Sequence, residues 1–189
     1  MDVRELVRGA LEEDGAEHDL TTLATVLEGA GARGILLAKD ELVVSGLDVA
    51  ALVFETVDPR SRLVPDVADG ARVGRGDALG TVEGYARALL QAERVALNFL
   101  QRLSGVATLT RQFVDAVAGT PAKIRGTRKT TPLLRALQKR AVVAGGGVPH
   151  RARLDAAILI KDNHVRLAGS VGEATRRAVA AAAGRPVEV

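Results

Sequence analysis

The apolar positions of the first 85 residues change from helical to strand-like spacing. Residues 3–11 repeat apolar side chains at helical intervals, and Asp2 and Glu5 form the capping-box pattern of a helix start. Residues 13–26 are typical of a loop that enters a first strand. Short apolar runs separated by charges and Gly-containing turns then predict strands between residues 34 and 84, including one at Val53–Val57. The pattern indicates a helix followed by a small β-rich unit.

The remaining chain alternates helices with short strands. Helical spacing predicts a long helix over residues 85–103 and a second helix over 106–119. Strands at 122–125, 156–161 and 186–189 then alternate with helices at 132–144 and 171–184, which favours a parallel α/β sheet or barrel. Thr131 and Pro132 should begin the first of these helices, and Ser170 and Glu173 should form a capping box on the second. The predicted fold class is α/β, with an α+β N-terminal unit.

Composition narrows the function classes. The chain of 189 residues has no cysteine, which excludes disulfides, thiolate nucleophiles and cysteine-bound zinc. Only 2% of residues are aromatic, so stacking platforms for single-stranded nucleic acid are scarce. The N-terminus lacks the pattern of a signal peptide, and no long uncharged apolar run is present. We therefore expect a cytoplasmic protein that does not contact membranes.

Charge is distributed unevenly, although the formal net charge is only +3. No Asp or Glu occurs from Ala116 to Leu154, whereas this stretch contains nine Lys and Arg residues and His150. A solvated helix face normally mixes both signs. The imbalance predicts an anionic ligand.

The predicted elements gather these cations at one edge. Arg128 and Lys129 lie between a strand and a helix start, where parallel α/β folds bind ligands and where free N–H groups attract anions. Lys161 ends the strand at 156–161. His150 and Arg151 follow three glycines that should provide a flexible backbone. Such a set of groups suits a ligand with more than one negative charge.

Simpler interpretations apply to each group alone. A single Arg128 or Lys129 is more often a solvated cation, and three glycines can merely end a helix. Three further cations are interpreted as an exposed helix face: Arg135, Lys139 and Arg140. The three histidines lack metal-ligand spacing, and neither a dinucleotide-binding glycine motif nor a P-loop is present. Residues alone thus indicate an anion-binding α/β protein.

Several motifs resemble one known family. "AERVALNFLQRLSGVAT", "TRKTTP", "GGGVPHR" and "LIKDNHV" occur in the order and spacing of quinolinate phosphoribosyltransferase, also called carboxylating nicotinate-nucleotide pyrophosphorylase. "EDGAEHDLTT" and "VVSGLDVA" fit the same family, so the resemblance covers essentially the whole chain. It implies an open-sandwich domain with its linking helix over residues 1–104 and the first part of a TIM-like α/β barrel over 105–189.

The resemblance also implies a reaction and its site. Family members transfer phosphoribose from phosphoribosyl pyrophosphate to quinolinate with loss of carbon dioxide, which yields nicotinate mononucleotide for NAD biosynthesis, with Mg²⁺ accompanying the pyrophosphate. Carried over by motif, the quinolinate pocket would contain Arg128, Lys129, His150, Arg151 and Lys161. Lys129 and Lys161 would also be catalytic residues facing the phosphoribosyl group, and no protein metal site is expected. Arg94 would enter from a neighbouring subunit of a homodimer or larger homo-oligomer with shared sites.

The sequence departs from the family pattern in two ways. Five positions carry residues other than those we expect: Gly126, Leu133, Arg140, Pro149 and Arg153. In addition, the family continues beyond the strand at 186–189 with acidic and glycine-rich segments, so we expect this chain to be a fragment without the C-terminal part of the barrel.

Two alternatives remain open. A non-catalytic homologue or fragment could bind small dicarboxylates or phosphates, or assemble with a complete enzyme. Nucleic-acid binding through the basic stretch is disfavoured, because the cations are interrupted by glycines and aromatic residues are few.

Overall fold

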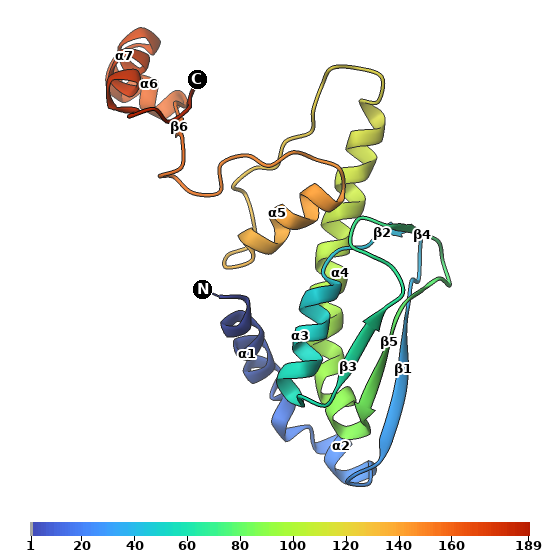
Figure 1. Cartoon of the computed structure of the whole chain (residues 1–189). Coiled ribbons are helices and arrows are strands. Elements are labelled where there is room, and N and C mark those ends of the chain that lie inside the picture. The colour runs from blue at the N-terminus through green and yellow to red at the C-terminus, as the bar shows by residue number, and fades with distance from the viewer. Residues whose placement is uncertain (1) are drawn as a thin grey trace.

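A three-stranded antiparallel sheet forms one layer of the N-terminal part. The computed structural model describes residues 2–189. The strands β1 (Gly31–Leu37), β5 (Ala78–Tyr85) and β3 (Arg62–Pro65) lie in the order β1-β5-β3 (Figure 1). Helices cover one face, whereas the other face exposes Ile35 and Val64, at 57% and 54%. This one-sided arrangement agrees with the predicted open sandwich.

Helix α1 (Val3–Asp14) confirms the first prediction from the sequence. The N–H of Asp2 donates to the Glu5 carboxylate at 3.0 Å, and Val7 is completely buried. The loop expected over residues 13–26 is wrong, because that segment contains a short 3₁₀ turn and α2 (Leu20–Thr25). Asp19 starts α2 by accepting the N–H of Thr22 at 3.1 Å. The hydrogen bond from the Thr22 hydroxyl, followed by this N–H bond, lowers the pKa of Asp19.

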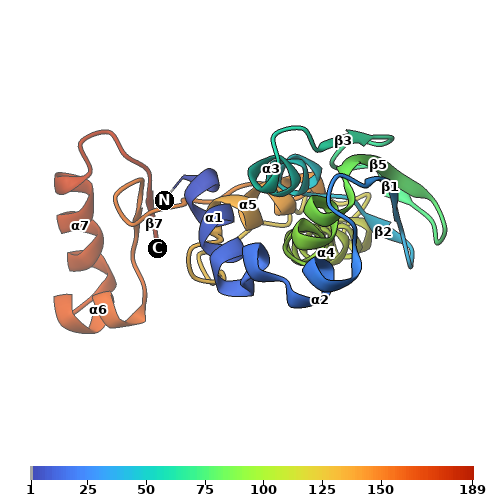
Figure 2. The same cartoon turned by 90° about the horizontal axis from the view of Figure 1, so that it is seen from below.

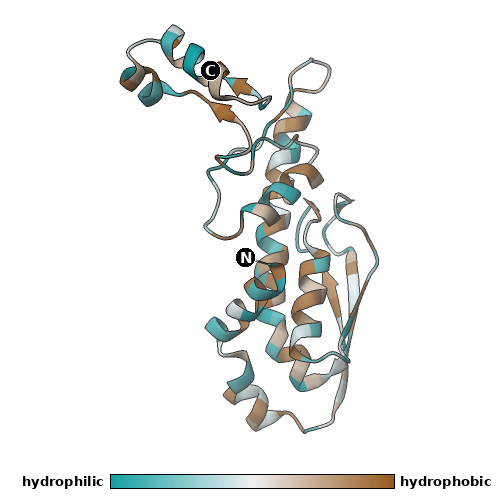
Figure 3. Cartoon of the chain, turned by 60° about the vertical axis from the view of Figure 1, so that its left-hand side comes forward, coloured by the Kyte–Doolittle hydropathy of each residue, from teal (hydrophilic) through white to brown (hydrophobic). Residues whose placement is uncertain are grey.

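Helix α3 (Leu47–Val57) replaces the strand expected at Val53–Val57. It is largely hydrophobic (Figure 3), and its buried residues recur at helical intervals: Leu47, Val49, Ala50, Val53 and Phe54. The Asp69 carboxylate caps its start by accepting the N–H groups of Gly46 and Leu47, at 2.8 and 3.2 Å. A cap supplied by a distant loop thus creates a helix where short apolar runs suggest a strand.

Gly46 allows this turn to lie against the next helix. Its φ is 102°, and a Cβ here would lie 2.7 Å from the Leu103 side chain. The neighbouring Ser45 and Ser104 are both buried and exchange two hydrogen bonds, at 3.0 and 3.3 Å. A two-stranded pair completes this region, β2 (Leu42–Val43) with β4 (Arg72–Val73).

Helix α4 (Ala86–Ala116) is one continuous helix of 31 residues. The two separate helices expected over 85–103 and 106–119 are therefore wrong. Gly105 does not interrupt the helix, and a Cβ added there would meet open space. Figure 2 shows α4 between the sheet and α1. The expected domain boundary at residues 104 and 105 falls inside α4, and the division into domains remains a prediction.

The C-terminal part contains only short parallel pairings. Arg125 and Val148 form a single parallel bridge in place of the strand expected at 122–125. β6 (Ile158–Leu159) pairs in parallel with β7 (Val187–Glu188). Two helices, α6 (Asp162–Ala168) and α7 (Val171–Ala181), lie between them in sequence (Figure 1). Parallel β–α–β order is confirmed, while a TIM-like barrel remains a prediction.

The helices of this part match the predictions unevenly. α6 (Asp162–Ala168) was not predicted. α7 (Val171–Ala181) begins as expected, with the N–H of Glu173 donating to Ser170 at 3.2 Å. The Glu173 carboxylate binds Arg176 and Arg177 instead of completing a capping box. Within residues 2–189, no helix is both long and apolar enough to cross a membrane.

Candidate functional site: a cation cluster beside helix α5

Two sets of positively charged or titratable side chains lie beside α5 (Arg135–Ala144). The charges of Arg128 and Arg135 act on Lys139, and those of His150 and Arg151 act on Glu188. We call the five residues the cation cluster: Arg128, Arg135, Lys139, His150 and Arg151. Partial burial lowers the pKa of Lys139, and the positive charges of Arg135 and Arg128 lower it further. The Lys139 ammonium donates to the backbone carbonyl of His150 at 2.9 Å. The fold thus holds like charges together, which is the electrostatic signature of an anion site.

Helix α5 contributes more to this cluster than the sequence suggested. Arg135 and Lys139 are one turn apart on the same face, and both are half-buried. Arg135 donates to the Thr130 hydroxyl at 3.1 Å and to the Ala152 carbonyl at 3.2 Å, so it joins the loops before and after the helix. The interpretation of these two residues as exposed surface is wrong. It is correct only for Arg140, which is exposed and pairs with Asp48 at 2.7 Å.

The start of α5 differs from the prediction. The helix begins at Arg135, not at Pro132, and its N-cap is Leu134. The N–H of Thr131 donates to the Gln138 side-chain carbonyl, and the Gln138 amide donates to the Thr131 hydroxyl, both at 3.0 Å. Gln138 is buried and therefore fixes the loop that carries Arg128 and Lys129.

The three glycines are a packing requirement rather than a source of flexibility. Gly145 and Gly147 are buried, and a Cβ on either would collide with Thr110 of α4. The flexible backbone expected here is wrong. The glycines instead hold the turn before His150 against α4, and the His150 carbonyl lies beside Lys139 of α5.

One acid reaches the cluster from a distant part of the chain. One carboxylate oxygen of Glu188, in β7, is hydrogen-bonded to Nε2 of the His150 ring at 3.0 Å. The other oxygen lies 3.6 Å from the Arg125 guanidinium. Contact with His150, followed by the charges of Arg125 and Arg151, holds the pKa of Glu188 below its usual value. Sequence reasoning missed Glu188, because it lies 38 residues after His150.

The other predicted site residues lie outside these contacts. Lys129 is exposed, with its backbone N–H bound to the Thr127 hydroxyl at 3.1 Å. Lys161 follows β6 and is exposed, and its N–H donates to the His164 ring at 2.9 Å. Arg94 is exposed on α4, two turns before Arg102, which is about 12 Å along the helix axis. No hydrogen bond or ion pair within residues 2–189 joins these three side chains to the cluster.

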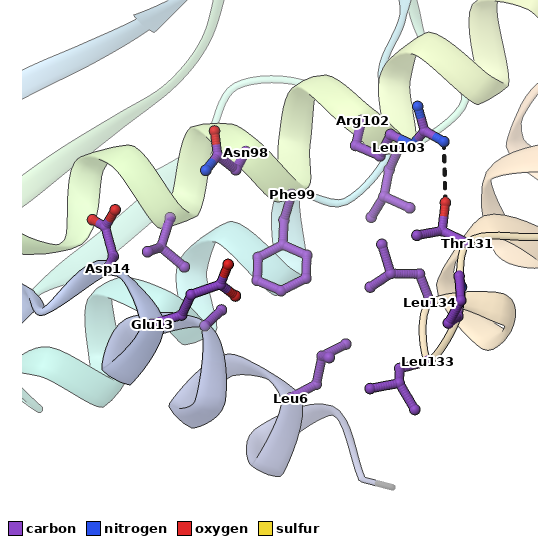
Figure 4. Close-up of a pocket in the computed structure, with 13 residues that line it drawn as sticks. Leu6, Glu13, Asp14, Asn98, Phe99, Arg102, Leu103, Thr131, Leu133 and Leu134 are labelled. Atoms are coloured by element: carbon purple, nitrogen blue, oxygen red, sulfur yellow. Dashed lines mark hydrogen bonds between the residues drawn. The ribbon is translucent and has the colours of Figure 1, made fainter.

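A cavity of about 540 Å³ adjoins the cluster between α1, α4 and the loop before α5. Figure 4 shows apolar side chains that line the cavity, among them Leu6, Phe99 and Leu134. It also shows the hydrogen bond of 3.0 Å from Arg102 to the Thr131 hydroxyl. Thr131 is therefore shared between this cavity and the loop of Arg128. Across residues 2–189, no group of three His, Asp or Glu side chains could hold a metal ion.

Known proteins match almost the whole chain in sequence and in structure. The N-terminal domain of quinolinate phosphoribosyl transferase matches residues 19–104, and its C-terminal domain matches residues 106–189. Nicotinate-nucleotide pyrophosphorylase [carboxylating] of Mycobacterium leprae is 50% identical over 98% of this chain. NadC of Streptococcus pyogenes is 40% identical, with a TM-score of 0.92 over 98% of this chain and 67% of that structure.

The chain belongs to the quinolinate phosphoribosyltransferase family. It spans 66% of the M. leprae protein and 50% of a quinolinate phosphoribosyltransferase [decarboxylating] of Nicotiana tabacum, which is 43% identical. The nicotinate-nucleotide pyrophosphorylase of Francisella tularensis, at 35% identity, has the same TM-score of 0.92. These structures confirm the α/β fold class.

The structure accounts for most departures from the family pattern. Arg140 pairs with Asp48, and the exposed Arg153 pairs with Asp155 at 2.7 Å. A Cβ at Gly126 would make an ordinary contact with Val142 at 3.5 Å, so the site has room for a side chain. Nothing in the structure explains Pro149.

Leu133 is the departure with a measurable consequence. Its φ is 66°, the left-handed conformation that favours the glycine expected here from the resemblance, and its side chain is 67% exposed. We expect Leu133→Gly to stabilise the chain by about 0.5 kcal/mol in urea unfolding, since relief of about 1–2 kcal/mol of strain exceeds the added entropy of the unfolded chain. The control Leu134→Gly, at a φ of −87°, should destabilise it. Equal losses in both variants would contradict the strain argument.

Proposed function

We propose that the cation cluster binds the two adjacent carboxylates of quinolinate. The observation that carries this proposal is the uncompensated positive charge around Lys139, whose pKa is lowered by burial, Arg135 and Arg128. A planar dicarboxylate would supply the missing negative charge, and the Arg128 and Arg151 guanidinium groups would each grip a carboxylate through paired hydrogen bonds. The buried Nε atoms of both arginines have no hydrogen-bond partner among residues 2–189.

The reaction in this proposal is phosphoribosyl transfer with decarboxylation. The pyridine nitrogen of quinolinate attacks the anomeric carbon of phosphoribosyl pyrophosphate as the bond to pyrophosphate breaks. The carboxylate beside that nitrogen then leaves as carbon dioxide, a proton takes its place, and nicotinate mononucleotide results. Fixed cations orient the nitrogen and stabilise charge that develops in the transition state. The residues assigned to the carboxylates are Arg128, His150 and Arg151, to which the geometry adds Arg135 and Lys139.

Lys129 and Lys161 are assigned to the phosphoribosyl side. Both side chains are exposed, so each is free to turn toward a phosphate or a departing pyrophosphate. Mg²⁺ would arrive with phosphoribosyl pyrophosphate as part of that substrate and offset its charge. A product of this kind belongs to NAD biosynthesis, and a cytoplasmic location is part of the proposal.

Arg94 is assigned to the quinolinate site of a neighbouring subunit, so this proposal requires a second copy of the chain. It does not join the cluster of its own chain, and it lies on the exposed face of α4 that also carries Asn98 and Arg102. A homodimer or larger homo-oligomer would let Arg94 reach the quinolinate site of the neighbouring subunit. Mixing an Arg94→Ala chain with an Arg128→Ala chain should then restore dicarboxylate binding to one site per mixed dimer.

The decisive experiment separates binding from turnover. Calorimetry with phthalate, which has the same adjacent carboxylates without the ring nitrogen, tests the cluster directly. Mass spectrometry for nicotinate mononucleotide with quinolinate, phosphoribosyl pyrophosphate and Mg²⁺ tests the reaction. Binding with turnover supports the enzyme, binding without turnover supports a dicarboxylate-binding homologue or fragment, and no binding to a folded sample contradicts both.

Lys139 gives the binding reaction a pH dependence. Its folded pKa is lowered, so the free protein loses this proton below the usual value of 10.5. A bound dianion opposes the repulsion from Arg135 and Arg128 and raises the pKa again, so binding should take up protons at alkaline pH and weaken as pH rises. Calorimetry at pH 9 in buffers of different ionisation enthalpy measures this uptake. Lys139→Arg should bind phthalate with less proton uptake. Unchanged uptake would show that Lys139 is not the group that takes up the proton.

A further inference from the structure

Arg111 and the turn at Gly145–Gly147 form an arrangement that the proposed chemistry does not use. Gly146 has a φ of 87°, and the Arg111 guanidinium lies where its side chain would be, with Nη2 2.6 Å and Cζ 2.9 Å from the position of an added Cβ. On the other two glycines, an added Cβ would approach Thr110 to 2.7 and 2.9 Å. One turn of α4 therefore covers the whole glycine turn.

Arg111 is itself held in place from its other side. Its Nη1 lies 3.5 Å from the Asp115 carboxylate, and Asp115 binds Arg72 of β4 at 2.6 Å. The Nε of Arg111 is buried without a hydrogen-bond partner in the described chain, residues 2–189. Leaving a buried donor of a cation without a hydrogen-bond partner is costly, which indicates that the position of Arg111 over the turn serves another purpose.

The turn leads directly into the cation cluster. The N–H of Val148 donates to the Ile124 carbonyl at 2.8 Å, and the N–H of Gly126 donates to the Val148 carbonyl at 3.2 Å. These bonds fix the register between the segment that carries Arg128 and the segment that carries His150. A displacement of the glycine turn would shift that register.

We propose that Arg111 is a positioning residue for the cation cluster, acting through Gly146 and the bridge at Val148. It touches no residue of the cluster, and its guanidinium face keeps the turn against α4. His150 and Arg151 consequently stand at a fixed place relative to Arg128. The effect on ligand binding rests on the proposed function, whereas the effect on His150 does not.

The test compares Arg111→Ala with Gln112→Ala, an exposed neighbour on the same helix, in the full chain. The chain has three histidines, so ring signals of His150 are resolved from those of His18 and His164 by NMR. Arg111→Ala should move the His150 signals and leave the other two unchanged, and phthalate affinity should fall about tenfold. Gln112→Ala should change neither. Unmoved His150 signals in Arg111→Ala would overturn the proposal.

A second variant excludes a general loss of structure. Gly146→Ala should displace the guanidinium and move the His150 signals in the same direction, and the double variant should be less than additive because both changes act on one contact. Fully additive effects would overturn the proposal. If alanine at position 111 prevents folding, Arg111→Lys retains the charge toward Asp115 but not the flat guanidinium, and the same His150 shift is expected. A moved His150 signal with no phthalate binding by the wild-type chain would support the positioning role and contradict the proposed function.

Discussion

Gly145→Ala should destabilise the chain by about 3 kcal/mol and lower its melting temperature by roughly 8 °C. The glycine has an ordinary helical φ of −72°, so backbone strain contributes nothing. An added Cβ would instead meet the Ala107 carbonyl oxygen and lie 2.7 Å from the Thr110 Cβ. Neither atom can rotate away, so the turn or α4 must move. Calorimetry or urea unfolding measures the loss.

Gly105→Ala is the matched control for this expectation. It adds the same methyl group to α4, at a position where a Cβ meets open space. Removing a glycine from a helix interior should stabilise the chain by about 1 kcal/mol. Opposite signs for the two substitutions would establish that close packing defines the glycine turn, and a stabilising Gly145→Ala would disprove it.

Arg128→Gln should weaken phthalate binding roughly 100-fold without lowering the stability of the chain. The substitution removes a guanidinium that we assign to a carboxylate, and it also removes one source of repulsion on Lys139. The pKa of Lys139 should therefore move back toward its usual value, which a lysine-selective NMR titration detects. Most core or packing residues would show the reverse pattern, with stability lost together with binding.

Arg140→Gln provides the comparison within the same region. Arg140 is exposed, and its partner is Asp48 of α3 rather than a member of the cluster. It should change phthalate affinity less than twofold, because an exposed ion pair contributes little and lies outside the site. Similar losses for Arg128→Gln and Arg140→Gln would mean that net charge, rather than the cluster geometry, attracts the ligand.

The parts of the fold with one buried face were predictable from the sequence. α1 repeats apolar side chains at helical intervals, and short apolar runs bounded by turns mark the strands of the sheet; those elements are present. α3 was missed because most of its residues are apolar, so its periodicity is weak, and because its cap is Asp69 from a later loop. Two helices were expected on either side of Ser104 and Gly105, but buried residues continue along the whole of α4, so it forms one helix.

The charged residues of the candidate site were also predicted only in part from the sequence. Arg128, His150 and Arg151 were predicted and lie in the cluster, although their roles remain predictions. Arg135 and Lys139 were open to detection, because like charges one turn apart are unfavourable on a helix without nearby acids. Glu188 was beyond the reach of local patterns, since only the pairing of β6 with β7 brings it to His150.

Glu188 comes late in the chain, so the electrostatics of the cluster depend on the order in which segments of the chain fold. The mutually repelling cations lie between residues 125 and 151, while the carboxylate that opposes them is in the last strand. During synthesis or refolding, β7 can pair with β6 only after the segment containing α6 and α7 has emerged and compacted. Arg125 and His150 therefore lack the opposing Glu188 carboxylate until this long-range contact closes. Completion of the binding surface thus becomes a step with high contact order, and early intermediates should carry an electropositive, salt-sensitive segment.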